Sequence, residues 1–411
     1  MTQQQLCLFD HLTHKANLKH TRYGWLRLTP AYSVHLVEDI LDRSLSKDAV
    51  VLDPFCGTGT TALVCAERGI TSHTTDINPF LLWLAETKTH SYDAKDLKDF
   101  ISASDKIADM MTPLIINKVW TPPIHQIEKW WDQDLLQALG YIMHAIRDSE
   151  NACSSNTVNL LKIAFCRVMI AHSSASFNHQ SMSFTKKQHN YTLFSKPPDD
   201  VKISWKAATN DIYRSAQTEI ILLPKVYLCD ARQLSTLLLH NYYTCVVTSP
   251  PYPNRMSYIR ELRPYMYWLG YLNDGREAGE LDWKAIGGTW GIATSKVGKW
   301  CPPINRPIPY ADFDEIIERI SRESDVLSRY VHKYFYDMID HINELFIVVK
   351  SGGSINYIVG NSKFYDVLLP VEEIFAALFK SSGFIDVKVK PIRKRTSKKE
   401  LYEYVVSATK P

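Results

Sequence analysis

One local feature restricts the fold of this chain more than any other: a short apolar stretch at residues 49–53 runs directly into a glycine-rich loop, and a helical pattern follows. Gly57 and Gly59 allow backbone angles that are closed to other residues, and they let a ligand approach the backbone closely. The helix expected at 60–69 would present free backbone amides to an anionic group. A strand, a glycine loop and a helix in this order are typical of a doubly wound α/β sheet, in which ligands bind at the carboxyl ends of the strands.

An acid at the end of the next strand supports a ligand at this loop. The strand expected at 71–76 ends in Asp76, and an acid about twenty residues after the loop can accept hydrogen bonds from the hydroxyls of a ribose. The loop lacks the Gly-Lys-Ser/Thr element of a P-loop, and Ala62 stands where a nicotinamide site has its third glycine. The sequence therefore predicts a different nucleoside-containing ligand, with an ordinary tight turn as the structural alternative.

A second rigid motif, Ser249-Pro250-Pro251-Tyr252, follows the apolar strand expected at 243–247. Proline has no amide donor and fixes the backbone, so the neighbouring carbonyls become fixed acceptors. Fixed acceptors beside a hydroxyl and an aromatic ring suit a planar ring that carries an amino group. The acceptors would hold the amino hydrogens while the tyrosine stacks on the ring. A proline-stiffened turn with a core tyrosine is the structural alternative.

The rest of the chain alternates strand and helix patterns, which predicts an α/β fold: a mostly parallel sheet with helices on both faces. Residues 91–220 carry mainly helical patterns, apart from 176–205, which we expect to be an irregular loop. Residues 271–310 are rich in Gly, Trp and Pro, and we expect them to be irregular as well. A long helix is expected from residue 327, followed by a strand, a helix and two further strands.

Composition limits the classes of protein to which the chain can belong. The hydrophobic fraction of 45% and the charged fraction of 22% are ordinary for a soluble globular protein. A net charge of +3 permits nucleic acid as a partner but does not argue for it. The sequence shows neither a run of roughly 18 apolar residues nor a signal-peptide core. The eight cysteines include no CxxC pair, so we expect a cytoplasmic protein with reduced thiols and no metal.

Together the two motifs resemble those of the DNA amino-methyltransferases, whose characteristic elements are FxGxG and (D/N/S)PPY. Phe55-Cys56-Gly57-Thr58-Gly59 and Ser249-Pro250-Pro251-Tyr252 fill these two elements. The resemblance implies a Rossmann-like fold, S-adenosylmethionine as methyl donor, and double-stranded DNA as substrate with the target base flipped out of the helix. The serine-led motif is similar to that of the cytosine-N4 group, which often works with a restriction endonuclease, so a cognate nuclease is a candidate partner.

The resemblance also implies which residues do what. It assigns catalysis to Ser249, Pro250, Pro251 and Tyr252. It assigns the methyl donor to Thr29, Pro30, Tyr32, Asp53, Pro54, Phe55, Cys56, Gly57, Thr58, Gly59, Thr60, Thr61, Asp76, Ile77, Asn78, Asp230 and Ala231. The catalytic domain would then comprise 1–90, 221–270 and 326–411, with a mostly helical insertion at 91–220 and a candidate target-recognition region at 271–325.

Three alternative functions stay open. An adenine-N6 DNA methyltransferase would use the same motifs, and an RNA amino-methyltransferase could share the fold. A DNA-binding module without activity is a third alternative, although both motifs are intact. Methylation at carbon 5 of cytosine is disfavoured, because the cysteine nucleophile of that family follows a proline and no cysteine here does.

Three stretches could contact DNA. Residues 284–310 carry Lys284, Lys296, Lys299 and Arg306 without an acid, together with glycines and tryptophans that suit phosphate and base contacts. Residues 176–205 also hold lysines and histidines. Residues 388–399 hold seven basic residues, Arg393 and Arg395 among them, and no acid, which predicts a phosphate-contacting hairpin. For each stretch a solvated surface segment is the alternative.

Overall fold

A computed structural model describes residues 21–26, 28, 31–44, 48–111, 119–176, 183–184, 197–254, 257–288, 292–395 and 400–411. At its centre lies a seven-stranded sheet with the order β10-β11-β7-β6-β1-β2-β5. The strands are β1 (Val50–Asp53), β2 (Thr71–Asp76), β5 (Lys225–Leu228), β6 (Tyr243–Thr248), β7 (Val349–Gly360), β10 (Ile385–Lys394) and β11 (Tyr402–Thr409). Pairing is parallel from β5 to β7, whereas β11 runs antiparallel to both β7 and β10.

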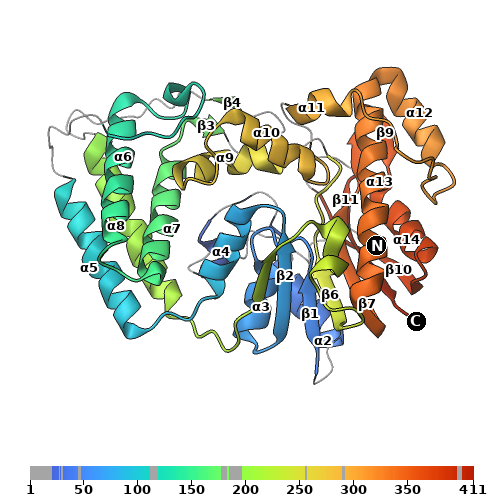
Figure 1. Cartoon of the computed structure of the whole chain (residues 1–411), viewed down its shortest axis with the longest axis horizontal. Coiled ribbons are helices and arrows are strands. Elements are labelled where there is room, and N and C mark those ends of the chain that lie inside the picture. The colour runs from blue at the N-terminus through green and yellow to red at the C-terminus, as the bar shows by residue number, and fades with distance from the viewer. Residues whose placement is uncertain are drawn as a thin grey trace.

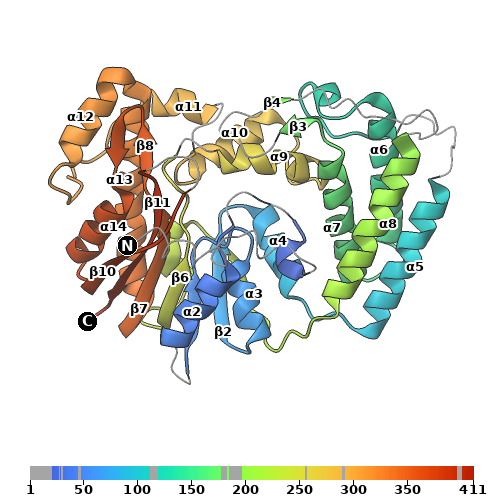
Figure 2. The same cartoon turned by 180° about the vertical axis from the view of Figure 1, so that it is seen from behind.

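Helices cover both faces of this sheet because successive side chains along each buried strand point to opposite faces. Val51 of β1 packs in one core with α2 (Val34–Ser44) and α3 (Thr60–Glu67), whereas the next residue, Leu52, packs in another with α13 (Asp325–Val348) and α14 (Val371–Ser381). The predicted α/β fold, a mostly parallel sheet between two helical layers, is confirmed. Figures 1 and 2 show these layers from opposite sides.

A group of helices lies beside the sheet, at the left of Figure 1. It consists of α5 (Ala94–Met110), α6 (Gln133–Ser149), α7 (Ser155–Ala171) and α8 (Pro197–Ala216). Its apolar core continues into α4 (Pro79–Thr89) and α9 (Tyr258–Trp268) through side chains such as Phe80 and Trp268. The predicted helical character of 91–220 is thus present, and the helices share a core with elements of the sheet domain.

Arg22 fastens this helical group to the sheet domain. Its side chain is buried and donates five hydrogen bonds to backbone carbonyls. Two of these carbonyls lie at the end of α4 (Lys88 and His90), and three lie at the end of α8, at Ser215, Ala216 and Thr218. The last carbonyls of a helix have no partner within it and carry partial negative charge, so a guanidinium is well suited to join the two ends.

The predictions of irregular structure for two segments are wrong in part. The stretch expected as a loop from 176 to 205 contains the start of α8 at Pro197, where proline is tolerated because the first amide of a helix needs no partner. The segment 271–310 contains α10 (Gly275–Lys284) and α11 (Ile292–Val297), and α12 (Phe313–Glu323) follows. Asp274 caps α10 by accepting hydrogen bonds from the amides of Arg276 and Glu277, a signal that the glycine and tryptophan content obscured.

The smaller elements complete the structure. They are the 3₁₀ helices η3 (Arg22–Gly24), η4 (Ile127–Lys129) and η5 (Ala231–Thr236) and the short strands β3 (Ala175–Ser176), β4 (Ser183–Phe184), β8 (Ser362–Phe364) and β9 (Val367–Leu369). Within the described ranges, no helix is both long and apolar enough to cross a membrane.

Candidate active site

The two sequence motifs, 190 residues apart along the chain, line one pocket of about 300 Å³. Its walls come from the carboxyl ends of β1, β2, β5, β6 and β7, from α9 and from the end of α10. In Figure 1, α9 and α10 lie above the sheet. Ligand pockets in open α/β sheets form at this edge. The glycine loop contributes Pro54, Phe55 and Gly57, and the second motif contributes all four of its residues.

The glycine loop has the backbone geometry that its sequence predicts. Gly57 and Gly59 both have positive φ, 51° and 74°, and Gly59 directly precedes α3. A Cβ atom at Gly59 would lie 3.1 Å from Cβ of Ala85 in α4. A larger residue at position 59 would therefore strain the turn and also press on α4.

Asp76 holds the loop from the neighbouring strand. Its Oδ2 accepts a 3.1 Å hydrogen bond from the amide of Gly57, and its Oδ1 accepts a 2.9 Å bond from the amide of Asn78. Burial raises the pKa of Asp76 to about 6, although these amide donors act in the opposite direction. The carboxylate also lines the pocket, so it can accept further hydrogen bonds from a bound hydroxyl.

Asp53 joins the two motifs beneath the pocket. Its Oδ1 accepts hydrogen bonds from the hydroxyl of Thr248 at 2.6 Å and from the amide of Phe55 at 3.1 Å. The Tyr32 hydroxyl lies 3.1 Å from Oδ2 and 2.5 Å from Oγ1 of Thr61. Burial raises the pKa of Asp53 to about 7 against the effect of these donors. Because Asp53 is buried and lies outside the pocket lining, its contacts order the site instead of meeting a ligand.

The Ser-Pro-Pro-Tyr motif is fixed on both sides by hydrogen bonds. The Ser249 hydroxyl donates to the carbonyl of Ile358 on β7 at 3.0 Å. The Tyr334 hydroxyl donates to the carbonyl of Pro251 at 2.7 Å, and the amide of Tyr252 donates to the Tyr258 hydroxyl at 3.0 Å. A serine that donates its proton to a carbonyl keeps its oxygen lone pairs for another donor. Ser249 lines the pocket, and its oxygen also lies 3.5 Å from the Tyr252 hydroxyl, so it can accept a hydrogen bond from a ligand.

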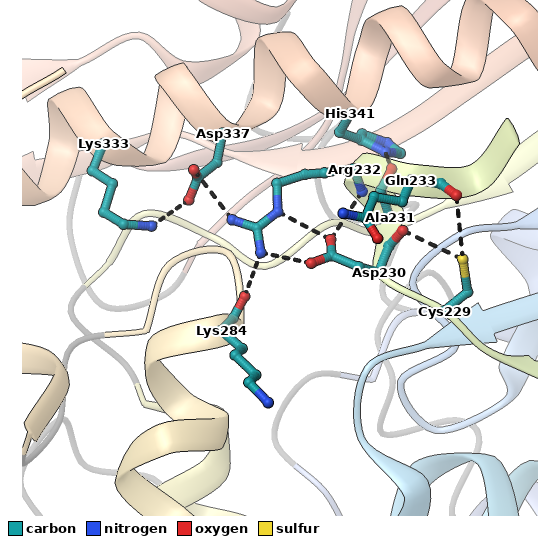
Figure 3. A network of polar contacts seen from close by, with 9 residues as sticks. All are labelled: Cys229, Asp230, Ala231, Arg232, Gln233, Lys284, Lys333, Asp337 and His341. Atoms are coloured by element: carbon teal, nitrogen blue, oxygen red, sulfur yellow. Dashed lines mark hydrogen bonds and ion pairs between the residues drawn. The ribbon is translucent and has the colours of Figure 1, made fainter. Parts of the chain in front are cut away.

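An ionic network holds Asp230 at the pocket wall (Figure 3). Arg232 binds both carboxylate oxygens of Asp230, from Nε at 3.0 Å and from Nη2 at 2.7 Å. The same guanidinium lies 3.2 Å from Asp337 of α13 and donates to the carbonyl of Lys284 at the end of α10 at 2.7 Å. Although burial by itself raises the pKa of Asp230, the hydrogen bonds from Arg232 bring it below its usual value. Asp230 is consequently an ionised acceptor, tied to α10 and α13.

Most predicted site residues gather in this pocket or directly beneath it. The pocket lining includes Tyr32, Pro54, Phe55, Gly57, Asp76, Ile77, Asn78, Asp230, Ala231, Ser249, Pro250, Pro251, Tyr252, Lys284, Arg393 and Arg395. The remaining residues of the loop lie outside the lining: Asp53, Cys56, Thr58, Gly59, Thr60 and Thr61. Thr29 and Pro30 lie outside the described residues.

The residues predicted to contact DNA separate into different environments. Lys296 and Lys299 are exposed near α11. Arg306 instead forms an ion pair with Asp340 at 2.6 Å and stacks over Tyr336 of α13, which indicates a structural role. Lys186 and Lys187, which belong to the second candidate stretch at 176–205, lie outside the described residues.

Sequence reasoning missed several residues of the pocket. They include Asn254, Ile259, Leu262, Ile358 and Glu403. Ile358 acts through a backbone carbonyl, which no side-chain motif can reveal, and Glu403 belongs to a strand that the sequence analysis identified only as a strand. Among the residues that the structure describes, no group of three or more His, Cys, Asp or Glu side chains could hold a metal ion.

Comparisons with known proteins agree with this geometry. Residues 11–87 match the family model described as DNA methylase, of the N6 and N4 type. The Type II methyltransferase M.AvaI of Nostoc sp. is 22% identical over 91% of this chain and 81% of its own length. The Type II methyltransferase M.BsoBI of Geobacillus stearothermophilus is 21% identical over 93% of this chain and 82% of its own length. M.MjaII of Methanocaldococcus jannaschii is 38% identical, but over only 23% of this chain and 17% of its own length.

Among solved structures, the rRNA methyltransferase aviRa from Streptomyces viridochromogenes aligns over 93% of this chain and 87% of its own, with 12% identity and a TM-score of 0.30. That structural similarity is too low to inform the fold or the substrate. The family match at the glycine loop and the relatives that align along nearly the whole chain support a DNA amino-methyltransferase.

Proposed function

We propose that this protein transfers a methyl group from S-adenosylmethionine to the exocyclic N4 amine of cytosine in duplex DNA, at a specific recognition sequence. The observation that carries the proposal is the position of the Ser249 oxygen. Its proton goes to the Ile358 carbonyl, and Ser249 lines the same pocket as Pro250, Gly57 and Asp76. The proposed amine acceptors and the proposed nucleoside site would therefore share one pocket.

The residues of the glycine loop suit the methyl donor. The Asp76 carboxylate is positioned to accept hydrogen bonds from ribose hydroxyls, and the turn at Gly57 lets a ligand approach the backbone. The ionised Asp230 provides a further acceptor on the same pocket. When bound, S-adenosylmethionine supplies an electrophilic methyl group on a sulfonium centre. Its positive charge complements the carboxylates of Asp76 and Asp230 in the pocket lining.

The second motif would activate the amine. The lone pair of an exocyclic amine is delocalised into the ring, so the amine is a poor nucleophile. Hydrogen bonds from both N–H groups to the Ser249 oxygen and the Pro250 carbonyl favour a tetrahedral nitrogen with a localised lone pair. Fixed acceptors need no reorganisation during the reaction, and positioning lowers the barrier further. The nitrogen would form the new N–C bond as the C–S bond of the sulfonium breaks, with S-adenosylhomocysteine leaving as a neutral thioether. The nitrogen would then lose one hydrogen as a proton to solvent.

The pocket requires the target base to leave the DNA helix. The acceptors lie inside the pocket beside Tyr252, where a base stacked in a duplex cannot reach them. Flipping the base into the pocket costs a few kcal/mol of stacking and pairing, which stacking on Tyr252 would partly offset. We assign the surrounding DNA contacts to the region 271–325, whose helix α10 ends at the pocket.

The choice of cytosine rests on the serine that leads the motif, because an aspartate leads it more often among adenine-N6 enzymes. A serine hydroxyl can accept from an amine or donate to a ring nitrogen, which suits cytosine. Adenine-N6 methylation is the second candidate, because the family match covers enzymes of both kinds. The Type II relatives also make a cognate restriction endonuclease a reasonable partner to seek.

One experiment tests the proposal directly. DNA from a host that expresses the protein is hydrolysed and analysed by mass spectrometry, and DNA from the same host without the protein is the control. We expect N4-methylcytosine, and sequencing of the methylated positions will give the recognition sequence. Methyl groups on adenine alone would overturn the choice of cytosine. If purified protein transfers tritiated methyl groups to RNA and not to DNA, the proposal of a DNA substrate is wrong.

A further inference from the structure

The C-terminal hairpin places three charged side chains in the same pocket as the Ser-Pro-Pro-Tyr motif. Arg393 and Arg395 come from β10 and its end, and Glu403 comes from β11. In the sheet, Arg393 pairs with Glu403 across β10 and β11, and Glu403 pairs with Gly360 across β11 and β7. A row of residues thus crosses the sheet from the hairpin to the end of β7.

Gly360 brings this row against the motif tyrosine. A Cβ atom at Gly360 would lie 2.9 Å from Cε2 of Tyr252 and 3.4 Å from Nη1 of Arg395. Only the absence of a side chain at this position therefore lets the Tyr252 ring pack against β7. The Arg395 guanidinium consequently lies close to the ring on which the target base is proposed to stack.

The three charged side chains of the hairpin differ in how many of their hydrogen-bonding groups are already bonded within the protein. Arg393 and Glu403 form two parallel hydrogen bonds, at 2.6 and 2.9 Å, and both side chains are largely buried. Among the residues that the structure describes, the Arg395 side chain donates one hydrogen bond, at 3.3 Å, to the carbonyl of Asn361. A guanidinium has five N–H donors, so Arg395 retains donors for a ligand in the pocket.

We propose that Arg395 reads the ring edge of the flipped base by donating to the ring nitrogen beside the amine, which is N3 in cytosine. This inference rests on the proposed function and adds a residue that recognises the substrate. An amine-bearing base presents a donor next to a ring acceptor, so it matches acceptors at Ser249 and Pro250 combined with a donor at Arg395. Thymine and uracil carry a hydrogen on N3, which would face the guanidinium as a second donor. The Arg393–Glu403 pair fixes the strand ends from which Arg395 projects.

The sequence alone predicts that the hairpin contacts a DNA phosphate. The surroundings of Arg395 instead favour recognition of the flipped base. A phosphate bound at Arg395 would lie in a pocket that also contains the carboxylate of Glu403, and like charges at such a site repel each other. Phosphate contacts also position a protein along DNA from its surface. Arg395 instead lines the pocket together with Tyr252.

The test combines a protein variant with a base analogue. Methyl transfer is measured with a duplex that carries the recognition sequence, and with the same duplex holding 3-deazacytosine, which has C–H in place of N3. For the wild-type protein we expect the analogue to lower kcat/KM roughly ten- to one-hundred-fold. Arg395→Gln should lower kcat/KM on normal DNA by a similar factor. For this variant, replacing cytosine by the analogue should lower kcat/KM little further. Such non-additivity is expected of groups in direct contact.

Matched variants separate this role from general charge effects. Arg43→Gln removes an exposed arginine of α2, whose ion pair with Asp39 spans 3.7 Å, and should leave all rates unchanged. Lys390→Gln removes a charge from an exposed position on the hairpin. Arg395→Met is the second variant if Arg395→Gln does not fold, as judged by thermal unfolding.

Each result decides between the alternatives. If the substitution and the analogue each lower kcat/KM by the same factor whether or not the other is present, the proposal is wrong. It is also wrong if the Arg395→Gln protein, like Lys390→Gln, binds any duplex more weakly with a smaller salt dependence while its kcat is unchanged, because that pattern marks a phosphate contact. If the wild-type protein methylates no DNA, it is the proposed function that has failed. Methylation of adenine alone would remove cytosine N3 as the partner of Arg395.

Discussion

The hydroxyl of Thr248 donates a 2.6 Å hydrogen bond to Oδ1 of Asp53, although 195 positions separate the two residues in the chain. Thr248 is the last residue of β6 and precedes Ser249, while Asp53 is the last residue of β1 and precedes the glycine loop. Because β1 and β6 are parallel neighbours in the sheet, both motifs begin at the same level. The bond therefore sets the distance between the proposed methyl-donor site and the proposed amine site.

Replacing Thr248 by valine tests this connection. Valine has nearly the same shape but cannot donate, so the buried Asp53 loses one of its donors. We expect the free energy of unfolding to fall by about 1–3 kcal/mol, measured by urea denaturation. Turnover should fall by more than the affinity for the methyl donor, since the two motifs lose their fixed separation. Equal stability of Thr248→Val and the wild type would show that this hydrogen bond contributes little.

The raised pKa of Asp76 predicts a pH dependence for binding of the methyl donor. Ribose hydroxyls donate to an ionised carboxylate better than to a protonated one, and burial places the pKa of Asp76 at about 6. Affinity should therefore rise as the pH increases through about 6. At about pH 5 roughly a tenth of the protein is ionised at Asp76, so the affinity should be roughly tenfold weaker than its limit at high pH. Calorimetry at several pH values measures this.

Two variants serve as controls for that titration. Asp76→Ala should weaken binding of S-adenosylmethionine strongly, and unchanged affinity would refute the assignment of Asp76 to the ribose. Asp76→Asn should bind more weakly and with little dependence on pH. A pH dependence that persists in Asp76→Asn would come from another group, such as Asp53, whose pKa is about 7.

The sequence predicts the centre of this fold well because local signals and tertiary structure agree there. The strand at Val50–Asp53, the turn at Gly57 and Gly59 and the helix from Thr60 each follow from short-range residue preferences. The positions of Asp76 and Ser249 follow from the parallel pairing of β1 with β2 and β6, since parallel strands end at one edge of the sheet. The convergence of the two motifs was therefore predictable.

Other parts of the site depend on long-range register, which a single sequence does not encode locally. Arg395 carries the same basic character as its neighbours, so sequence alone suggested a contact with phosphate. Its place in the pocket arises because β11 inserts antiparallel between β7 and β10 and sets Gly360 opposite Glu403. Arg306 was grouped with Lys296 and Lys299 for a similar reason, although the fold pairs it with Asp340.

We predict that the two lysines near α11 contribute to the affinity for DNA. Lys296 and Lys299 are exposed, so replacing both by alanine should weaken binding to any duplex and reduce the slope of log K against log salt by roughly 1–2. Titrations at several salt concentrations measure both effects. An unchanged affinity and slope would show that this segment does not contact DNA. Arg306→Ala is the contrasting variant and should mainly lower thermal stability, because its ion pair and stacking join the segment to α13.

Removing the Ser249 hydroxyl should separate chemistry from binding of the methyl donor. In the structure this hydroxyl donates to Ile358 and leaves its lone pairs for the target amine. Ser249→Ala keeps the backbone of the motif, including the Pro250 carbonyl, but loses one of two proposed acceptors for the amine hydrogens. An interaction that strengthens as the nitrogen becomes tetrahedral acts on the transition state, so its loss lowers kcat. We expect a decrease of roughly a hundredfold, with little change in the calorimetric affinity for S-adenosylmethionine. Ser321→Ala, on α12 and outside the pocket lining, is the matched control and should retain full activity. A Ser249→Ala protein with normal kcat in single-turnover measurements would exclude the hydroxyl as an acceptor and leave the Pro250 carbonyl to hold the amine.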